Sequence, residues 1–290
     1  MASGNQEKQC GNIQIRAITP DRMQDFAAMQ ALEHKVWHMP HTLPLHQVLT
    51  VAKNGGILLG AFADSLLVGL LYSFPGYLNR QVYLCSHMLG IREEWRHHGL
   101  GAQLKLAQAA AARQAGYSLI TWTYDPLESA NANLNISKLG AVCSTYIVNC
   151  YGEMQDSLNQ GLPSDRFQVA WWLTQPQVPV LPDGTEYQAI PWRLTGNTLI
   201  EPVGEADLAA EFLDQASRVT VAVPADTQLM KEENMTLAKD WRAVTRQAFT
   251  ALFAAGWIVT AFRRLPGVPA NEYILVRQEA LGLPQPPWQE

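Results

Sequence analysis

The most constraining feature of the chain is a short polar turn that stands between an apolar run and an alanine-rich stretch: Arg96-His97-His98-Gly99-Leu100-Gly101. The run before it, from Gln81 to Ile91, is rich in β-favouring residues, which predicts a largely buried strand. The stretch after it, from Leu100 to Ala115, has no proline and many strong helix formers, which predicts a helix. The turn therefore joins a strand directly to the start of a helix.

A turn of this kind is suited to phosphate. The first amides of a helix have no intrahelical acceptor, glycines let a ligand approach the main chain, and Arg96 adds a positive charge. The pattern R-x-x-G-x-G alone is also typical of an ordinary exposed strand-to-helix turn. The chain has no G-x-x-x-x-G-K-[ST] motif and no G-x-G-x-x-G with a matching acidic residue, which excludes two other phosphate-binding motifs.

The segments around the turn predict the order β, α, α, β, β, β, turn, α. Upstream of it we expect a strand at 13–16, a helix through Phe26, Met29 and Leu32, a helix over 45–53, and a hairpin of strands at 57–63 and 66–74. Downstream we expect a strand at 118–124, a short helix over 128–139 and a strand at 143–150.

This order, together with the turn, resembles the Gcn5-related N-acetyltransferase superfamily over about the first 150 residues. The resemblance implies an α+β fold with a mixed, splayed central sheet flanked by helices. Further signatures resemble a mostly uncharacterised branch of that superfamily, some members of which are similar to amino-acid N-succinyltransferases: Ser86 to Gly90, Trp122 to Leu127, Asn131 to Asn135 through Lys138 to Gly140, Tyr151-Gly152 and Ser164 to Phe167.

The resemblance implies acetyl-CoA or another acyl-CoA as co-substrate, and no metal. The residues expected to bind it are Leu89, Gly90, Ile91, Arg96, His97, His98, Gly99, Leu100, Gly101, Asn131 and Asn135. The amide near Leu89 would donate to the thioester carbonyl, while Gly90 and Ile91 would pair with the pantetheine arm as an added strand. Asn131 and Asn135 are one helical turn apart and can face the same side; the alternative is a frayed, solvent-facing helix.

An amine must lose a proton before it attacks a thioester, so such a site needs a base. By resemblance, Glu33 lies on the helix that borders the acceptor cleft, and His87 lies beside the expected thioester position. The alternatives are a solvated helix carboxylate for Glu33 and a core histidine bonded to a neighbour for His87.

Many members of the superfamily carry a tyrosine on the short helix that protonates the departing thiolate, but here the position holds Ile136. Tyr146, Tyr124 or water would have to serve instead. A thiolate whose conjugate acid has a pKa of about 8.5 is already a tolerable leaving group, so the loss of a dedicated acid need not abolish turnover.

Asp125 and Arg166 are the candidates for binding the acceptor. Asp125 follows a predicted strand and precedes a proline, which favours an Asx-type turn over a bond to the incoming amine. Arg166 could pair with a carboxylate of an amino acid or of a succinyl group, or with a carboxylate of this chain such as Asp165.

A proline-rich stretch after Trp172 divides the chain. We expect a catalytic domain over 1–173, a connector over 174–196 and a smaller α+β region over 197–290. In that last region we expect strands at 198–203, 219–223, 257–264 and 272–277, and helices over 205–217 and 237–255. We find no convincing internal repeat in the sequence.

Charge and hydropathy limit the partners. A net charge of −5, with no dense basic run, argues against general binding to nucleic acid or to an anionic membrane. No apolar run is long enough to span a bilayer and no secretion signal is evident, so we expect a cytoplasmic protein. The four cysteines show no C-x-x-C spacing, and we expect them to be reduced.

Together these observations predict an acyl-CoA-dependent N-acyltransferase. It would move an acetyl or succinyl group to the amine of a small acceptor, an amino acid by resemblance, through direct attack in a ternary complex. The alternative is a non-catalytic acyl-CoA-binding or sensing protein, which Ile136 favours, while His87 and the polar stretch from Asn131 to Asn135 oppose it. A homodimer is a further option.

Overall fold

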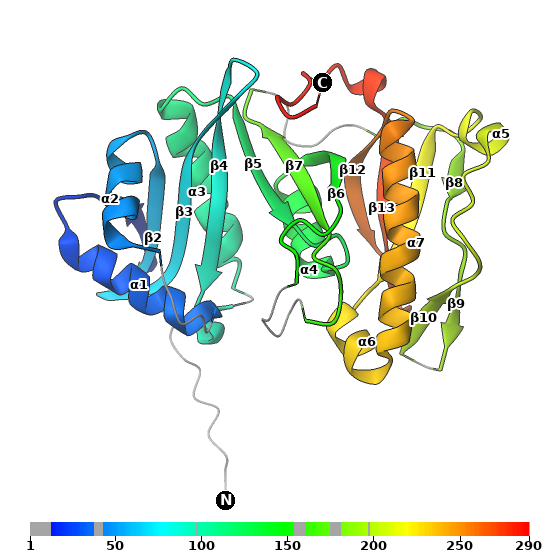
Figure 1. Ribbon diagram of the computed structural model, residues 1–290, viewed down its shortest axis with the longest axis horizontal. Coiled ribbons are helices and arrows are strands. Elements are labelled where there is room, and N and C mark those ends of the chain that lie inside the picture. Colours follow the sequence, from blue (N-terminus) through cyan, green and yellow to red (C-terminus); the bar gives the residue numbers. More distant parts are fainter. Residues whose placement is uncertain are drawn as a thin grey trace, which may run out of the picture. The chain divides into compact units, whose positions relative to one another are not determined.

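The computed structural model describes residues 13–37, 43–96, 98–153, 160–174, 181–196 and 198–289. The chain forms two compact units, whose elements Figure 1 labels. Unit 1 consists of Met1–Tyr77 and Val82–Ser118, and unit 2 consists of Leu78–Gln81 and Leu119–Glu290. The domain boundaries expected near residues 173 and 196 stay a prediction.

Unit 1 is built on a sheet with the strand order β1-β2-β3-β4. Its elements are β1 (Ile13–Ala17), α1 (Met23–Trp37), α2 (Leu45–Lys53), β2 (Ile57–Ala63), β3 (Leu66–Leu78), β4 (Gln81–Ile91), the 3-10 turn η1 (Glu93–Trp95) and α3 (Leu100–Gln114). Strand β2 pairs antiparallel with β1 and with β3. The predicted element order is confirmed, and β4 covers the whole predicted run.

Two apolar clusters cover the two faces of this sheet. Leu58 and Phe62 of β2 join the cluster that includes α1 and α2 residues, whereas Leu59 and Ala61 join the cluster beneath α3. Alternate residues of a strand point to opposite faces, so a strand covered on both faces is apolar throughout. This explains why β2 and most of β3 have no polar alternation.

The first part of unit 2 contains β5 (Leu119–Tyr124), α4 (Ser129–Ala132), η2 (Asn133–Lys138), β6 (Val142–Ile147) and β7 (Arg166–Trp172). Strand β7 lies between β5 and β6 and is antiparallel to both. The expected α-helix over 128–139 is only partly correct, because η2 is a π-helix in which the amide of Leu139 donates to the carbonyl of Leu134. The segment contains three asparagines, which have low helix propensity, so the change from an α-helix to a wider π-helix costs little free energy. Single π-helical turns are frequent at functional sites.

The rest of unit 2 contains β8 (Glu186–Gln188), β9 (Trp192–Thr195), β10 (Leu199–Pro202), α5 (Ala210–Leu213), β11 (Arg218–Pro224), α6 (Thr227–Glu233), α7 (Met235–Ala254), β12 (Trp257–Arg264), β13 (Ala270–Arg277) and the 3-10 turn η3 (Gln278–Leu281). Strand β8 pairs parallel with β11, whereas β13 pairs antiparallel with β11 and with β12, so the sheet is mixed. The predicted α+β class is confirmed.

The stretch expected to be a connector, 174–196, contains two strands, β8 and β9, and its role as a connector stays a prediction. One expectation for this region needs correction. The helix expected over 205–217 is reduced to α5, because the amides of Val203 and Asp207 donate to the carbonyls of Pro191 and Ala189. These bonds fix an extended path before α5 and leave room for one helical turn only.

The two parts of unit 2 share one topology. Strand β5, a helical segment, β6 and β7 correspond to β11, α6 with α7, β12 and β13, and in each set the last strand lies between the other two. Both helical segments end at a glycine in the left-handed region, Gly140 (φ 70°) and Gly256 (φ 81°). We call residues 119–172 the first copy and residues 218–277 the second copy.

The copies meet edge to edge. Strand β6 pairs antiparallel with β12, at Cys143 and Val259, which gives the palindromic strand order β5-β7-β6-β12-β13-β11. Helix α7 packs on β6, β11 and β12 (Figure 1). The sequence showed no repeat because the copies share topology and a hydrophobic pattern, while their residues differ.

An aromatic cluster forms the core between the copies. The ring of Phe167 on β7 lies 4.7 Å from Phe249 on α7 and 5.3 Å from Tyr273 on β13, as measured between ring centroids. Tyr124 and Tyr146 also pack against Phe167, edge-on. Both copies therefore contribute to one buried core.

Candidate active site

The turn before α3 has the open main chain that a phosphate group requires. Gly99 precedes α3 with φ 75°, and a Cβ built on it would meet nothing within 4 Å. None of the described side chains caps this helix, so its first amides are left for solvent or a ligand. Gly101 and the buried Leu100 lie in the first turn, His98 is exposed, and His97 lies outside the described residues.

Arg96 is exposed beside this turn, and its Nε donates to the carbonyl of Ile91 at 3.3 Å. None of the carboxylates in the described part of the chain lies within ion-pair distance of its guanidinium. The bond to Ile91 directs the side chain along the end of β4, and its charge is not neutralised by a neighbouring acid. It can therefore bind an anion.

The end of β4 uses its side chains for packing. Leu89 and Ile91 pack with Leu100 and Leu104 beneath α3. A Cβ on Gly90 would lie 2.5 Å from Cη2 of Trp37, so glycine is required for Trp37 to cover this strand. Any contact of these three residues with pantetheine would have to come from the backbone.

The alternation of side chains along β4 breaks at His87. Ser86 bonds to α3, while the His87 ring lies 6.0 Å from the Tyr72 ring on the opposite face. The next residue, Met88, packs on the cluster that contains Tyr72 as well. Two successive side chains on one face indicate a bulge in β4, which turns the backbone away from regular pairing.

His87 is suited to accept a proton. Its side chain is exposed, with one side of the ring against Tyr72 and Phe74. This partial burial lowers the pKa of His87 below the usual 6.5. The imidazole is therefore mostly neutral at pH 7, and it is neither enclosed nor paired with a carboxylate among the residues described.

Glu33 is buried and not the solvated carboxylate of the alternative interpretation. Its Oε1 and Oε2 accept from the amide of Leu43 at 3.1 and 3.3 Å, while Gln30 Nε2 donates to the carbonyl of the same residue. Burial raises the pKa of Glu33. Glu33 thus anchors Leu43, and it keeps the raised pKa that a general base requires.

Lys105, on α3, is a buried polar residue that was not predicted from the sequence. Its Nζ donates to Ser86 Oγ at 2.8 Å, and Ser86 Oγ donates to Gln108 Oε1 at 3.2 Å. Lys105 is fully buried, and burial holds its pKa well below the usual value. The helical spacing gave a signal, because Lys105 lies seven residues before the buried Ala112 and so on the same stripe.

In unit 2, Asp125 forms the expected Asx-type turn. Its Oδ1 accepts from the amide of Leu127 at 2.9 Å, and its Oδ2 lies 2.5 Å from Arg242 Nη2 and 3.6 Å from Arg166 Nη1. Arg166 is buried and also donates to the carbonyl of Asp165 at 2.8 Å. Arg166 therefore pairs with a carboxylate of this chain, that of Asp125, and with the main-chain carbonyl of Asp165.

Tyr146 donates a hydrogen bond to the carboxylate of a second ion pair, which Asp165 forms with Arg246. Asp165 is fully buried and accepts from Arg246 Nε and Nη2 at 2.7 and 2.9 Å, and from Tyr146 Oη at 2.7 Å. Burial alone would raise the pKa of Asp165, but these donors outweigh it and lower the pKa. Burial raises the pKa of Tyr146. To protonate a thiolate, Tyr146 would first have to leave Asp165.

The two candidate asparagines have different surroundings. Asn131 is exposed in α4, and Asn135 is buried in η2. Ile136, which the sequence resemblance aligns with a tyrosine of the superfamily, is buried too. The roles of Arg242 and Arg246 were not predicted from the sequence either. Nothing in the residue pattern of α7 indicates that these arginines pair with carboxylates more than seventy positions earlier in the chain.

The candidate residues thus form two sets. Unit 1 contains the turn, the end of β4, His87 and Glu33, whereas unit 2 contains Asp125, Asn131, Asn135, Tyr146 and Arg166. Within unit 2, the structure brings Asp125 and Arg166 together, and Tyr146 joins them through Asp165.

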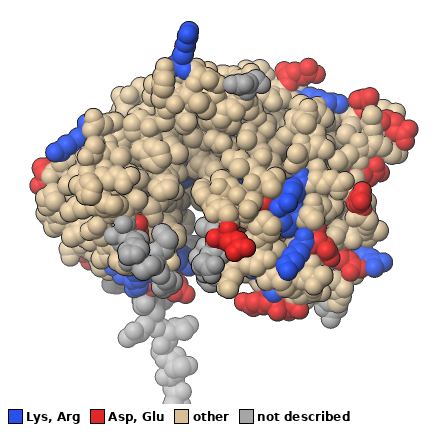
Figure 2. Space-filling view, in the orientation of Figure 1, with Lys and Arg blue, Asp and Glu red and all other residues tan. Residues whose placement is uncertain are grey.

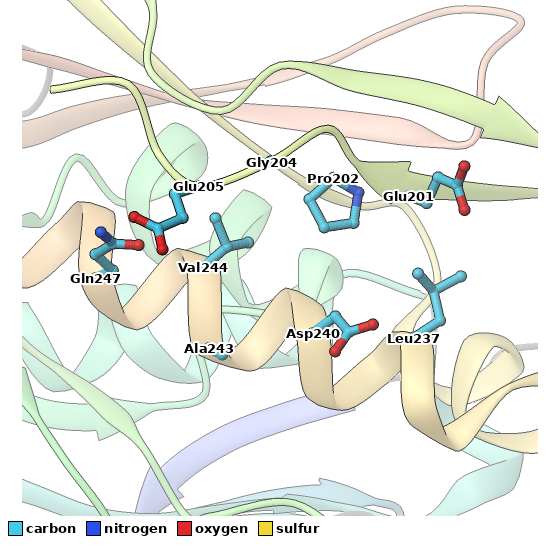
Figure 3. A pocket seen from close by; sticks show the side chains of 9 residues that line it. All are labelled: Glu201, Pro202, Gly204, Glu205, Leu237, Asp240, Ala243, Val244 and Gln247. Atoms are coloured by element: carbon cyan, nitrogen blue, oxygen red, sulfur yellow. The ribbon is translucent and has the colours of Figure 1, made fainter.

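A separate groove of about 400 Å³ lies between β10 and α7 and contains none of these candidates. Its lining includes three carboxylates, from Glu201, Glu205 and Asp240, and Figure 3 shows the residues of β10 and its following loop facing those of α7. No group of three or more metal-ligating side chains occurs among the described residues. On the face in Figure 2, acidic and basic side chains are interspersed.

None of the helices in the described ranges is long and apolar enough to cross a membrane. No protein-family model matches the chain, and no curated protein matches it either.

Several solved structures are similar to part of the chain. The NatC complex bound to Gag peptide and CoA has a TM-score of 0.45 and 15% identity, covering 56% of this chain and 98% of that chain. A GNAT-family acetyltransferase from Streptococcus pneumoniae has a TM-score of 0.43 and 18% identity, covering 55% and 98%. A GNAT-family acetyltransferase from Elizabethkingia anophelis with acetyl-CoA bound has a TM-score of 0.41 and 16% identity, covering 56% and 98%. The superfamily named in two of these descriptions is the one that the sequence resembles.

Proposed function

We propose that the chain is an acyl-CoA-dependent N-acyltransferase of the Gcn5-related superfamily. The observation that carries the proposal is the strand-to-helix turn. Gly99 leaves open space above its backbone, no side chain caps α3, and Arg96 stands beside it without a carboxylate partner among the described residues. These features fit a pyrophosphate, which needs amide donors and a positive charge.

Coenzyme A supplies the acyl group as a thioester. The neutral His87 would accept the proton of the amine, directly or through water, and Glu33 is the second candidate. The amine nitrogen forms a bond to the thioester carbon, the carbon–sulfur bond breaks, and the thiolate leaves with the electron pair. The backbone of β4 near Leu89 would bond the carbonyl oxygen as negative charge develops on it.

We propose a small amine as the acceptor, an amino acid in particular, and acetyl or succinyl as the transferred group. Support for the amino acid and for succinyl comes from the resemblance of the sequence alone. A peptide amino terminus is the competing acceptor class, and one similar structure is described with a bound peptide. An acyl-CoA-binding protein without turnover is the competing function, which the buried Ile136 at the superfamily's tyrosine position favours.

Mass spectrometry tests the proposal. The purified protein is incubated with acetyl-CoA or succinyl-CoA, in separate reactions, and with either a mixed amino-acid pool or a peptide pool. An N-acylated amino acid supports the full proposal, and an acylated peptide replaces the acceptor class. Tight binding of coenzyme A by calorimetry without any product would favour the binding protein, and the absence of both would contradict the proposal.

A further inference from the structure

Three buried polar side chains join β4 to α3 within unit 1 (Figure 1). Lys105 Nζ donates to Ser86 Oγ at 2.8 Å, and Ser86 Oγ donates to Gln108 Oε1 at 3.2 Å. All three residues are buried, Lys105 with 2% of its surface exposed. We call Ser86, Lys105 and Gln108 the Ser86 anchor. The proposed reaction uses none of these three side chains.

The Ser86 anchor is costly for stability. Burial holds the pKa of Lys105 well below its usual value, which means that the surroundings oppose the charged amine. The titratable group that interacts with Lys105 is Cys85, whose own pKa is raised by burial, so its thiol is neutral at pH 7 and does not balance the amine. Gln108 Nε2 has no hydrogen-bond partner among the described residues. Apolar side chains of similar size are often more stabilising at such positions.

The Ser86 anchor lies directly before the bulge in β4. Ser86 faces α3, whereas His87 and Met88 both lie on the opposite face, where the Tyr72 cluster packs. Leu89 then packs beneath α3 again. If the bulge moved one residue toward the start of β4, His87 would turn toward α3 and away from the Tyr72 ring.

Apolar packing alone does not determine where this bulge lies. Leu89 packs with apolar residues of α3, and such contacts are non-directional, so a shifted strand could make similar ones. Hydrogen bonds are directional, and the best-attested use of costly buried polar groups is to fix register. Ser86 has the only hydroxyl between Leu84 and Ile91, so a shifted β4 would leave Lys105 and Gln108 without this partner.

We propose that Lys105 is a positioning residue for the candidate base His87, and that it acts through Ser86 and the bulge in β4. This inference rests on the proposed function. The bond from Lys105 holds Ser86 on α3 and thereby fixes the bulge that follows it. The bulge keeps the His87 ring against Tyr72 and Phe74 while its side chain stays exposed. The helix that would bind pyrophosphate at its start therefore also sets the position of the base.

The test compares Lys105→Met, Ser86→Ala and the double variant with Lys53→Met, which removes an exposed lysine from α2. NMR measures the nuclear Overhauser contacts between the His87 ring and the aromatic rings beside it, and the His87→Ala spectrum identifies the His87 signals. Steady-state kinetics give kcat and the KM for acyl-CoA, with the substrates found by mass spectrometry. Thermal unfolding confirms that each variant is folded at the assay temperature.

We expect Lys105→Met to weaken the ring contacts of His87, to lower kcat about fivefold and to leave the KM for acyl-CoA within about twofold. Because both residues act through one bond, Ser86→Ala and the double variant should lower kcat to the same extent, and Lys53→Met should resemble the natural protein. Unchanged ring contacts, an unchanged kcat, or additive losses in the double variant would overturn the positioning role. If Lys105→Met does not fold, the same readouts on Ser86→Ala decide.

Failure of this inference can be told apart from failure of the proposed function. If the natural protein makes no acylated product, the proposed function fails, while the ring contacts still report whether Lys105 sets the position of His87. If the natural protein is active and Lys105→Met keeps both its kcat and its ring contacts, only the positioning role fails.

Discussion

The two copies in unit 2 have one topology and different chemistry. In the first copy, Asp125 directly follows β5 and pairs with two arginines, and β6 carries Tyr146, which donates to the buried Asp165. In the second copy, β11 is apolar over most of its length and ends at Pro224. Several polar side chains of the second copy, among them Thr227 and Arg242, bond instead to the first copy.

This difference shows what a repeated topology retains. The hydrophobic pattern must be kept in both copies, because it builds the shared core. Polar groups are costly to bury, so they persist where they are paired or used. The segments that precede the two copies also differ, because the glycine turn and α3 precede the first copy, whereas β9, β10 and α5 lie between β8 and β11 before the second copy.

The largest effect should come from breaking the core that joins the copies. Phe249 is fully buried against Phe167 and Tyr273, so Phe249→Ala should lower the free energy of unfolding by about 3–5 kcal/mol, as measured by denaturant titration. Phe212→Ala is the control, because Phe212 is exposed and should cost less than about 1 kcal/mol. Equal losses from both substitutions would mean that the copies do not share a core.

The next largest effect should come from His87 of unit 1, the candidate base. If His87 is the base, His87→Ala should lower kcat about a hundredfold. His46→Ala on α2 removes an exposed histidine and should leave kcat unchanged. Full turnover of His87→Ala, with coenzyme A binding intact, would assign the base to another residue.

The pH profile gives an independent check on the same residue. Because burial lowers the pKa of His87, the neutral base should persist below pH 6.5, and kcat/KM should fall only as the pH drops further. In His87→Ala this acidic limb should disappear. An unchanged limb would show that another group titrates there.

A smaller effect should locate the pyrophosphate. Gly99 and Gly116 flank α3, both have positive φ, and neither has an atom within 4 Å of an added Cβ. Gly99→Val and Gly116→Val should therefore strain the backbone to a similar degree. Only Gly99→Val should weaken coenzyme A binding, by about tenfold in Kd, as measured by calorimetry. Similar Kd values for both variants would place the phosphate elsewhere.

The smallest effect should come from Lys105. Its pKa in the folded chain is well below the unfolded value of about 10.4, so the unfolded state binds more protons and stability rises with pH up to that value. Lys105→Met should remove this rise and raise Tm at neutral pH by about 2–4 °C. A lower Tm with the pH dependence retained would mean that the bond to Ser86 outweighs the cost of burial.

Much of unit 1 was predictable, because its signals are local. The run from Gln81 to Ile91 and the helix starting at Leu100 were found within one residue of their observed ends, since apolar runs, glycines and helix formers act over short distances. The bulge at His87 was not predictable. It depends on which face α3 and the Tyr72 cluster cover, and that is decided by packing.

The candidate site in unit 2 was found only in part. Asp125, Tyr146 and Arg166 were named from the sequence, and the Asx-type turn at Asp125 was expected because it spans two residues. Their partners Arg242 and Arg246 lie far along the chain, and no local pattern distinguishes a helix arginine that enters a core from one in solvent.

The sequence by itself determined the local units of this protein: the strand, open turn and helix around Gly99, the apolar strands, and the residue types able to hold phosphate or accept a proton. The tertiary structure decided that residues 218–277 repeat the topology of residues 119–172, and that Arg242 holds Asp125. Hydrophobic periodicity and turn residues act between neighbours in sequence, whereas ion pairs and strand order depend on segments that meet only after the chain has packed.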